Sequence, residues 1–147
     1  MGNSKGIYRL SMLQYAIASL AMALDLFAIF DLANFSGYDH YNAVVGPTVA
    51  VAALDPAPLA LSLWLIGIVA GPAAFCAVLC KNHWLTTRLA VLSAICITFV
   101  MFIGWADLHA KPIMGFAPTN FYLAYVALHG LLAVTSGRLA HRMRFTA

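Results

Sequence analysis

Four long apolar stretches constrain this chain more than any other feature of its sequence. They lie near residues 10–33, 58–80, 86–108 and 118–140. A helix of about 20 residues crosses a hydrocarbon layer of roughly 30 Å, so each stretch is long enough to span a membrane. In lipid, backbone polar groups must be paired within the protein, and an open sheet edge leaves them unpaired. We therefore predict an all-α integral membrane protein, a four-transmembrane-helix bundle with one membrane domain over residues 1–147.

The composition supports this prediction. Of the 147 residues, 63% are hydrophobic and 9% are charged. One small soluble domain cannot bury that much apolar surface, so lipid must cover the remainder. The sequence has no glycine-rich phosphate loop and no nucleophile elbow, and it contains no glutamate. It therefore shows none of the motifs typical of nucleotide-binding or hydrolytic sites.

The basic residues lie mostly at one end of the predicted bundle. Seven of the eight flank that end: Lys5, Arg9, Lys81, Arg88, Arg138, Arg142 and Arg144. At or near the other end lie Lys111, Asp31, Asp39, Asp55 and Asp107. Because basic flanks stay on the cytoplasmic side, we expect a multi-pass protein of the inner (cytoplasmic) membrane with both termini in the cytoplasm. The basic rim also accounts for the net charge of +3, so no nucleic-acid partner is needed.

Two ionisable residues, Asp25 and His129, lie deep within predicted helices at similar distances from the outer end. An ionisable side chain inside a membrane costs several kcal/mol unless it is paired, so each one needs a partner or a function. One interpretation is a structural or proton-handling pair that faces across the bundle. The other leaves Asp25 hydrated near the surface and His129 bonded to a neighbouring carbonyl. A third candidate, Asp107, lies at the outer end of its helix, where water is close.

Metal and cofactor sites are not favoured by the pattern. Cys76, Cys80 and Cys96 fall inside predicted helices, where small apolar packing is the simplest role, although the i, i+4 pair Cys76 and Cys80 would also suit a metal or redox chemistry. Haem held between helices requires histidines at matching depth, and His129 has no such partner. We expect no cofactor and no bound haem, copper or iron.

Aromatic residues near the predicted boundaries, including Trp64 and Trp84, are expected to form interfacial belts.

From its third helix onward the chain resembles subunit III of haem–copper oxidases and the short relatives associated with nitric oxide reductases. The segment from Asn120 to Leu131 is similar to the family pattern of an aromatic pair followed by a histidine and Gly-Leu. The stretch from Arg88 to Asp107 resembles the family helix that ends with an aromatic and an acidic residue. Asp25, followed by Phe27 and Phe30, stands where members place a glutamate before phenylalanines.

The chain also departs from this family pattern. Leu132 replaces a second histidine, aspartates replace both glutamates, and Gly137 is one residue late. The chain also stops where the shorter members would begin another helix. A chain with these departures has three interpretations: a reduced relative of the family, a split or truncated gene product, or a coincidence of apolar composition.

This resemblance implies a noncatalytic accessory subunit that supports assembly, lipid binding and proton uptake. Its partners would be membrane lipid and the catalytic subunit of a haem–copper oxidase or nitric oxide reductase, which would carry out catalysis. Two other hypotheses remain open. One is a small homo-oligomeric carrier or channel with a protonatable Asp25, and the other is a haem-binding membrane anchor.

The charge asymmetry leads to a prediction about topology. In a background without native cysteines, a cysteine at Ser36 should react with an impermeant thiol reagent added outside, and a cysteine at Asn82 should not. Labelling of intact cells measures this. The reverse pattern would overturn the orientation.

Overall fold

The computed structural model describes residues 2–33, 57–106 and 119–144. Within these ranges it consists of α-helices and contains no strand. The helices are α1 (Gly2–Ala33), α3 (Ala57–Leu79), α4 (His83–Ala106) and α5 (Thr119–Arg144). All four are long and apolar enough to cross a membrane. The predicted set of four helices is therefore confirmed for the described residues.

Two helices are longer than the apolar stretches that predicted them. Helix α1 begins at Gly2 rather than near residue 10, and α5 continues to Arg144 rather than ending near residue 140. Hydropathy marks the part of a helix that suits lipid, whereas helical hydrogen bonding continues into polar flanks. The last turn of α5 is basic, which is favourable beside the unpaired carbonyl groups at a helix C-terminus.

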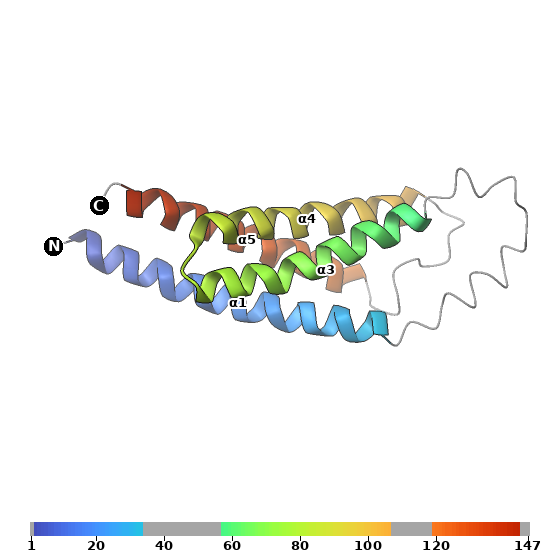
Figure 1. Ribbon diagram of the computed structural model, residues 1–147, viewed down its shortest axis with the longest axis horizontal. Coiled ribbons are helices and arrows are strands. Elements are labelled where there is room, and N and C mark those ends of the chain that lie inside the picture. Colours follow the sequence, from blue (N-terminus) through green and yellow to red (C-terminus); the bar gives the residue numbers. More distant parts are fainter. Residues whose placement is uncertain (1, 34–56, 107–118, 145–147) are drawn as a thin grey trace, which may run out of the picture.

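The helices form a bundle in which neighbours run antiparallel or nearly so (Figure 1). The main packing contacts join α3 to α4, α4 to α5, α1 to α5 and α1 to α3, so α1 and α4 lie on opposite corners. The start of α1, the end of α5 and the α3–α4 turn all lie at the same end of the bundle, which we call the terminal end (Figure 1). The described basic residues of the predicted rim belong to these segments.

A tight turn joins α3 to α4. Lys81 adopts a left-handed conformation with φ of 56°. The amide of Lys81 donates to Val78 O, and the amide of Asn82 donates to Ala77 O, which together form a Schellman motif. The side chain of Asn82 then caps α4 by accepting a hydrogen bond from the amide of Leu85 at 3.1 Å. Asn82 therefore ends one helix and begins the next.

Buried residues recur every three or four positions along each helix, the spacing that keeps one face towards the bundle axis. In α1 these residues are Gln14, Ala18, Ala21, Asp25 and Ala28. Many are small, which lets the helix backbones approach closely, as helices packed within lipid require.

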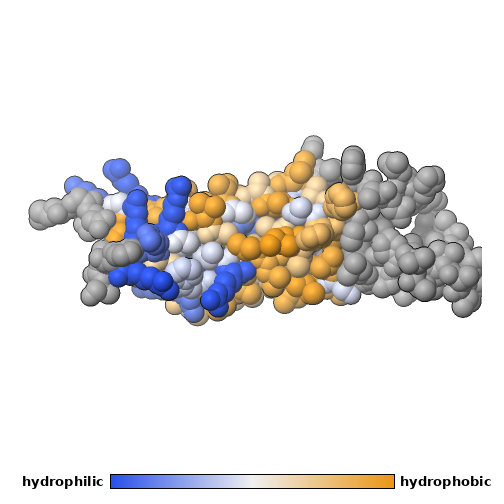
Figure 2. Space-filling view, turned by 90° about the horizontal axis from the view of Figure 1, so that it is seen from above, coloured by the Kyte–Doolittle hydropathy of each residue, from blue (hydrophilic) through white to orange (hydrophobic). Residues whose placement is uncertain are grey.

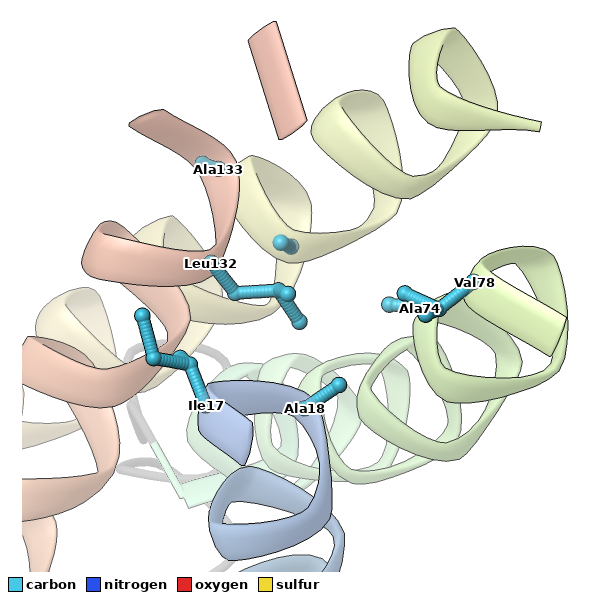
Figure 3. Close-up of a cluster of buried hydrophobic side chains, with 7 residues drawn as sticks. Ile17, Ala18, Ala74, Val78, Leu132 and Ala133 are labelled. Carbon is cyan, nitrogen blue, oxygen red and sulfur yellow. The ribbon is translucent and has the colours of Figure 1, made fainter. Parts of the chain in front are cut away.

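The apolar part of the core is divided into two clusters. The terminal-side cluster contains Ile17, Ala18, Ala74, Val78, Ala90, Leu132 and Ala133. The far-side cluster contains Ala28, Trp64, Ile68, Ile97, Val100, Tyr122 and Tyr125. Figure 3 shows Leu132 reaching from α5 into the space between α1 and α3 within the first of these. Along α1 and α5, Asp25 and His129 lie between the residues of the two clusters.

The outer surface is apolar over most of its length. On the face shown in Figure 2, hydrophilic residues gather towards the terminal end, and hydrophobic residues predominate in the described part beyond them. Large apolar side chains that point outward include Leu20, Val69, Phe99, Phe102 and Leu131. These side chains are exposed within the described part of the chain, and so they match a lipid environment.

Trp64 differs from its expected position. The sequence placed it in an interfacial belt, but it is 1% exposed and packs in the far-side cluster, so that expectation was wrong. Trp84 is 43% exposed near the terminal end, where its ring packs under the guanidinium of Arg144 at 4.5 Å. Nearness to the end of an apolar stretch does not show which way a side chain faces.

Candidate functional site

Asp25 and His129 meet inside the bundle. Asp25 comes from α1 and His129 from the neighbouring helix α5, and the distance from His129 Nε2 to Asp25 Oδ1 is 3.4 Å. Both side chains are 0% exposed. The structure thus brings together the two residues whose similar depths indicated a pair. The alternative in which Asp25 is hydrated at the surface does not fit its complete burial.

The other ring nitrogen of His129 is also engaged. Nδ1 lies 2.9 Å from the carbonyl oxygen of Tyr125, one turn earlier in α5. A carbonyl oxygen accepts but does not donate, so Nδ1 carries the hydrogen in this bond. The local bond that the sequence offered as an alternative therefore exists together with the contact to Asp25. It fixes the orientation of the imidazole ring.

These two contacts define the proton content of the site. With a hydrogen on Nδ1, a neutral imidazole presents a lone pair at Nε2. That lone pair and an ionised Asp25 carboxylate would repel each other at 3.4 Å. A second proton, on either Nε2 or the carboxyl group, makes the contact attractive. The pair is then neutral overall in both arrangements, which its surroundings of low polarity favour.

Gly71 on α3 provides the space that Asp25 occupies. A Cβ atom at this position would lie 2.5 Å from Asp25 Cγ and 2.6 Å from Oδ2, and it would overlap Oδ1 even more closely. The carboxyl group therefore rests directly against the α3 backbone. The next residue, Pro72, lies within α3 and has no amide hydrogen to donate. Gly71 is thus a position where any side chain displaces either α1 or the carboxyl group.

A hydroxyl network adjoins the pair. The rings of Tyr125 and His129 stack with centroids 4.2 Å apart. The Tyr125 hydroxyl lies 3.0 Å from Ser93 Oγ on α4 and donates to the carbonyl oxygen of Gly67 on α3 at 3.2 Å. Ser93 Oγ donates to the same carbonyl oxygen at 2.9 Å. All four helices contribute to this polar layer, which comprises Asp25, Gly67, Gly71, Ser93, Tyr125 and His129.

Sequence reasoning missed this network because it searched for ionisable residues. Ser93 and Tyr125 are uncharged, and their partner is a backbone carbonyl. Gly67 and Gly71 form a Gly-x-x-x-Gly pattern in an apolar helix, a known signal for close helix contact. That pattern was the available clue to which face of α3 lies inward.

A second polar group lies nearer the terminal end and was also not predicted. Gln14 on α1 is fully buried. Its amide nitrogen donates to Ser136 Oγ at 2.8 Å and lies 3.2 Å from His83 Nδ1. An amide NH₂ group only donates, so Nδ1 of His83 is the acceptor. The terminal-side cluster lies between this group and the Asp25–His129 pair.

The remaining candidates have separate outcomes. Asp107 lies outside the described residues. Cys96 is buried, as expected of a packing residue, whereas Cys76 and Cys80 are exposed and do not pack inside the bundle. Among the described residues there is no group of three or more His, Cys, Asp or Glu side chains placed to hold a metal ion.

Comparisons with protein-family models, curated proteins and solved structures find no match to this chain. The resemblance to subunit III of haem–copper oxidases stays a prediction from the sequence. The function is therefore argued below from the geometry of the polar layer.

The fit of Asp25 against α3 leads to a prediction with an internal control. Gly71→Ala should destabilise the detergent-solubilised protein, because the new Cβ overlaps the Asp25 carboxyl group. Gly130→Ala should be neutral or stabilising, because a Cβ there meets nothing within 4 Å and alanine is the better helix former. Thermal unfolding of both variants measures the difference. Equal melting temperatures would contradict the close contact at Gly71.

A double-mutant cycle tests the pair. Asp25→Asn and His129→Leu should each destabilise the protein, on the order of 3–5 kcal/mol for breaking a buried ion pair. The double variant should lose less than the sum of the two. Unfolding free energies or melting temperatures measure this coupling.

The control for this cycle combines Asp25→Asn with His141→Leu. His141 is exposed near the end of α5, so its effect should simply add to that of Asp25→Asn. If the Asp25–His129 cycle is equally additive, the two residues act independently.

Proposed function

We propose that this protein is a noncatalytic accessory membrane subunit that holds one exchangeable proton on the Asp25–His129 pair. The observation that carries the proposal is the fully buried contact of 3.4 Å between Nε2 and Oδ1. Nδ1 donates its hydrogen to the Tyr125 carbonyl oxygen. The contact between Nε2 and Oδ1 therefore becomes attractive when one further proton binds to either of these two groups. A paired acid and imidazole inside a membrane are typical of groups that take up and release protons.

The proposed partner is the catalytic subunit of a haem–copper oxidase or nitric oxide reductase. Support comes from the two motif residues of the resemblance. Asp25, before Phe27 and Phe30, and His129, in the segment from Asn120 to Leu131, belong to different helices. A chance similarity of apolar helices would not require these two residues to meet, and they do meet.

The geometry also bears on the other hypotheses. Asp25 faces His129 and the α3 backbone within its own bundle, so it is not presented to a second copy or to a substrate on the outer surface. Both ring nitrogens of His129 face protein oxygen atoms, which leaves neither of them directed at a haem iron. The contacts therefore favour a proton-holding pair over a carrier site or a haem ligand. We propose that the bundle lies in the inner membrane with both termini in the cytoplasm.

Copurification tests the partner. The tagged chain, extracted from native membranes in mild detergent, should bring down a larger subunit whose reduced-minus-oxidised spectrum shows haem. The isolated chain should show no Soret band of its own. Self-association without a haem-containing partner would contradict the accessory role, and a stoichiometric Soret band from the isolated chain would contradict the absence of a cofactor.

Infrared difference spectroscopy over a pH series tests the proton. The wild type should show a titrating carboxyl and imidazole signal that is absent in Asp25→Asn and retained in His141→Asn, because His141 is remote from the pair. A spectrum unchanged by Asp25→Asn would mean that the pair does not exchange a proton. This measurement is independent of the identity of the partner.

A further inference from the structure

A basic hollow lies on the outer side of α5 near the terminal end. It has a volume of about 510 Å³ and is lined by Val134, Gly137, Arg138, His141 and Arg142. All five residues come from one helix, α5. The hollow is separate from the Asp25–His129 pair, which is buried inside the bundle.

The same helix face changes from apolar to basic along its length. Leu131 and Val134 are more than half exposed, and Arg138 and Arg142 follow at helical spacing. Residues three or four apart lie on one face of a helix. At about 1.5 Å per residue, the path from Leu131 to Arg142 covers roughly 16 Å. An elongated amphipathic molecule could contact both parts of this face at once.

Arg142 lies at the boundary between α5 and α1. A Cβ atom added to Gly6 of α1 would be 3.3 Å from Arg142 Nη1. The guanidinium group is therefore held close to the α1 backbone at the end where Lys5 and Arg9 also lie. This part of the surface combines several positive charges with an adjoining apolar face that suits lipid.

From these features we infer that the hollow binds the headgroup of an anionic phospholipid. The phosphodiester oxygens accept hydrogen bonds from Arg138 and Arg142, and an acyl chain lies along Val134 and Leu131. Arginine suits this role because its planar guanidinium group donates two parallel hydrogen bonds to a phosphate. Basic pockets beside transmembrane helices bind such headgroups on the cytoplasmic side, which agrees with the proposed orientation.

A lipid, rather than a soluble anion, accounts for both halves of the face. A free phosphate would use the arginines but would leave Leu131 and Val134 without a role. A zwitterionic lipid would cover the apolar residues but carries no net negative charge to match the basic group. The inference does not depend on a proton at Asp25 or on an oxidase partner.

Lipid binding to the purified full-length chain in nanodiscs tests the inference. Phosphatidylglycerol should bind the wild type more tightly than phosphatidylcholine. The variant R138Q/R142Q should bind phosphatidylglycerol about 30-fold more weakly, since each basic residue near the surface contributes roughly a factor of five. The control K81Q/R88Q removes two charges at the same end but outside the hollow, and it should bind like the wild type.

Each contrary outcome has a definite meaning. Equal weakening in the two double variants would overturn the site in favour of a diffuse charge effect. Equal binding of phosphatidylcholine would overturn the requirement for an anionic headgroup. Competition by inorganic phosphate at the same concentrations as the lipid would show a soluble-anion site instead.

A second measurement needs no variant. Photoactivatable phosphatidylglycerol, crosslinked to the wild type and mapped by mass spectrometry, should label the α5 segment from Leu131 to Arg142. Labelling spread evenly over all four helices would overturn the inference even if R138Q/R142Q failed to fold.

Discussion

The contact between Asp25 and His129 is the interaction on which the rest of the arrangement depends. A carboxyl group inside a membrane has no bulk water to solvate it, so its partner must come from the protein. Here the partner is an imidazole ring already oriented by the Tyr125 carbonyl, at 3.4 Å from the carboxyl oxygen. This requirement fixes the rotation of α1 and α5 about their own axes. A rotation of either helix would move one of the two groups towards lipid.

The close approach of α3 follows from the same requirement. Asp25 fits only because Gly71 has no side chain, and Gly67 leaves its carbonyl within reach of Ser93 and Tyr125. Association of helices in lipid relies on tight packing and on hydrogen bonds rather than on the hydrophobic effect. The small residues and the polar layer therefore act together: close backbones bring the donors and acceptors within range, and their bonds keep the backbones close.

Hydropathy was sufficient to predict the helices, because it depends on position along the chain. Similar depth offered an Asp25–His129 pair as one of two interpretations, and the contact between them is present in the structure. Neither hydropathy nor depth could predict how each helix is rotated about its own axis, and this rotation decides which side chains face the bundle interior. Trp64 lies near the end of its span, so depth alone indicated an interfacial belt, whereas its actual orientation buries it against Ile97 and Tyr122. Gln14 was overlooked for a related reason. A neutral amide gives little signal against an apolar background, although buried amides also need partners.

The two apolar clusters on either side of the polar layer bear on how the proposed proton could move. The terminal-side cluster separates Asp25 and His129 from the Gln14, His83 and Ser136 group, so the described core has no continuous chain of hydrogen bonds between them. Under the proposed function, exchange therefore requires a displacement of a helix or access through a partner. Helix α1 is the element that can couple to such a change, because it carries Asp25, whose carboxyl group rests directly against Gly71 of α3. A shift of α1 would alter the carboxyl–imidazole distance and the α1–α3 contact together. A subunit that contacts the outer face of α1 could thereby control where the proton resides without supplying any group to the site.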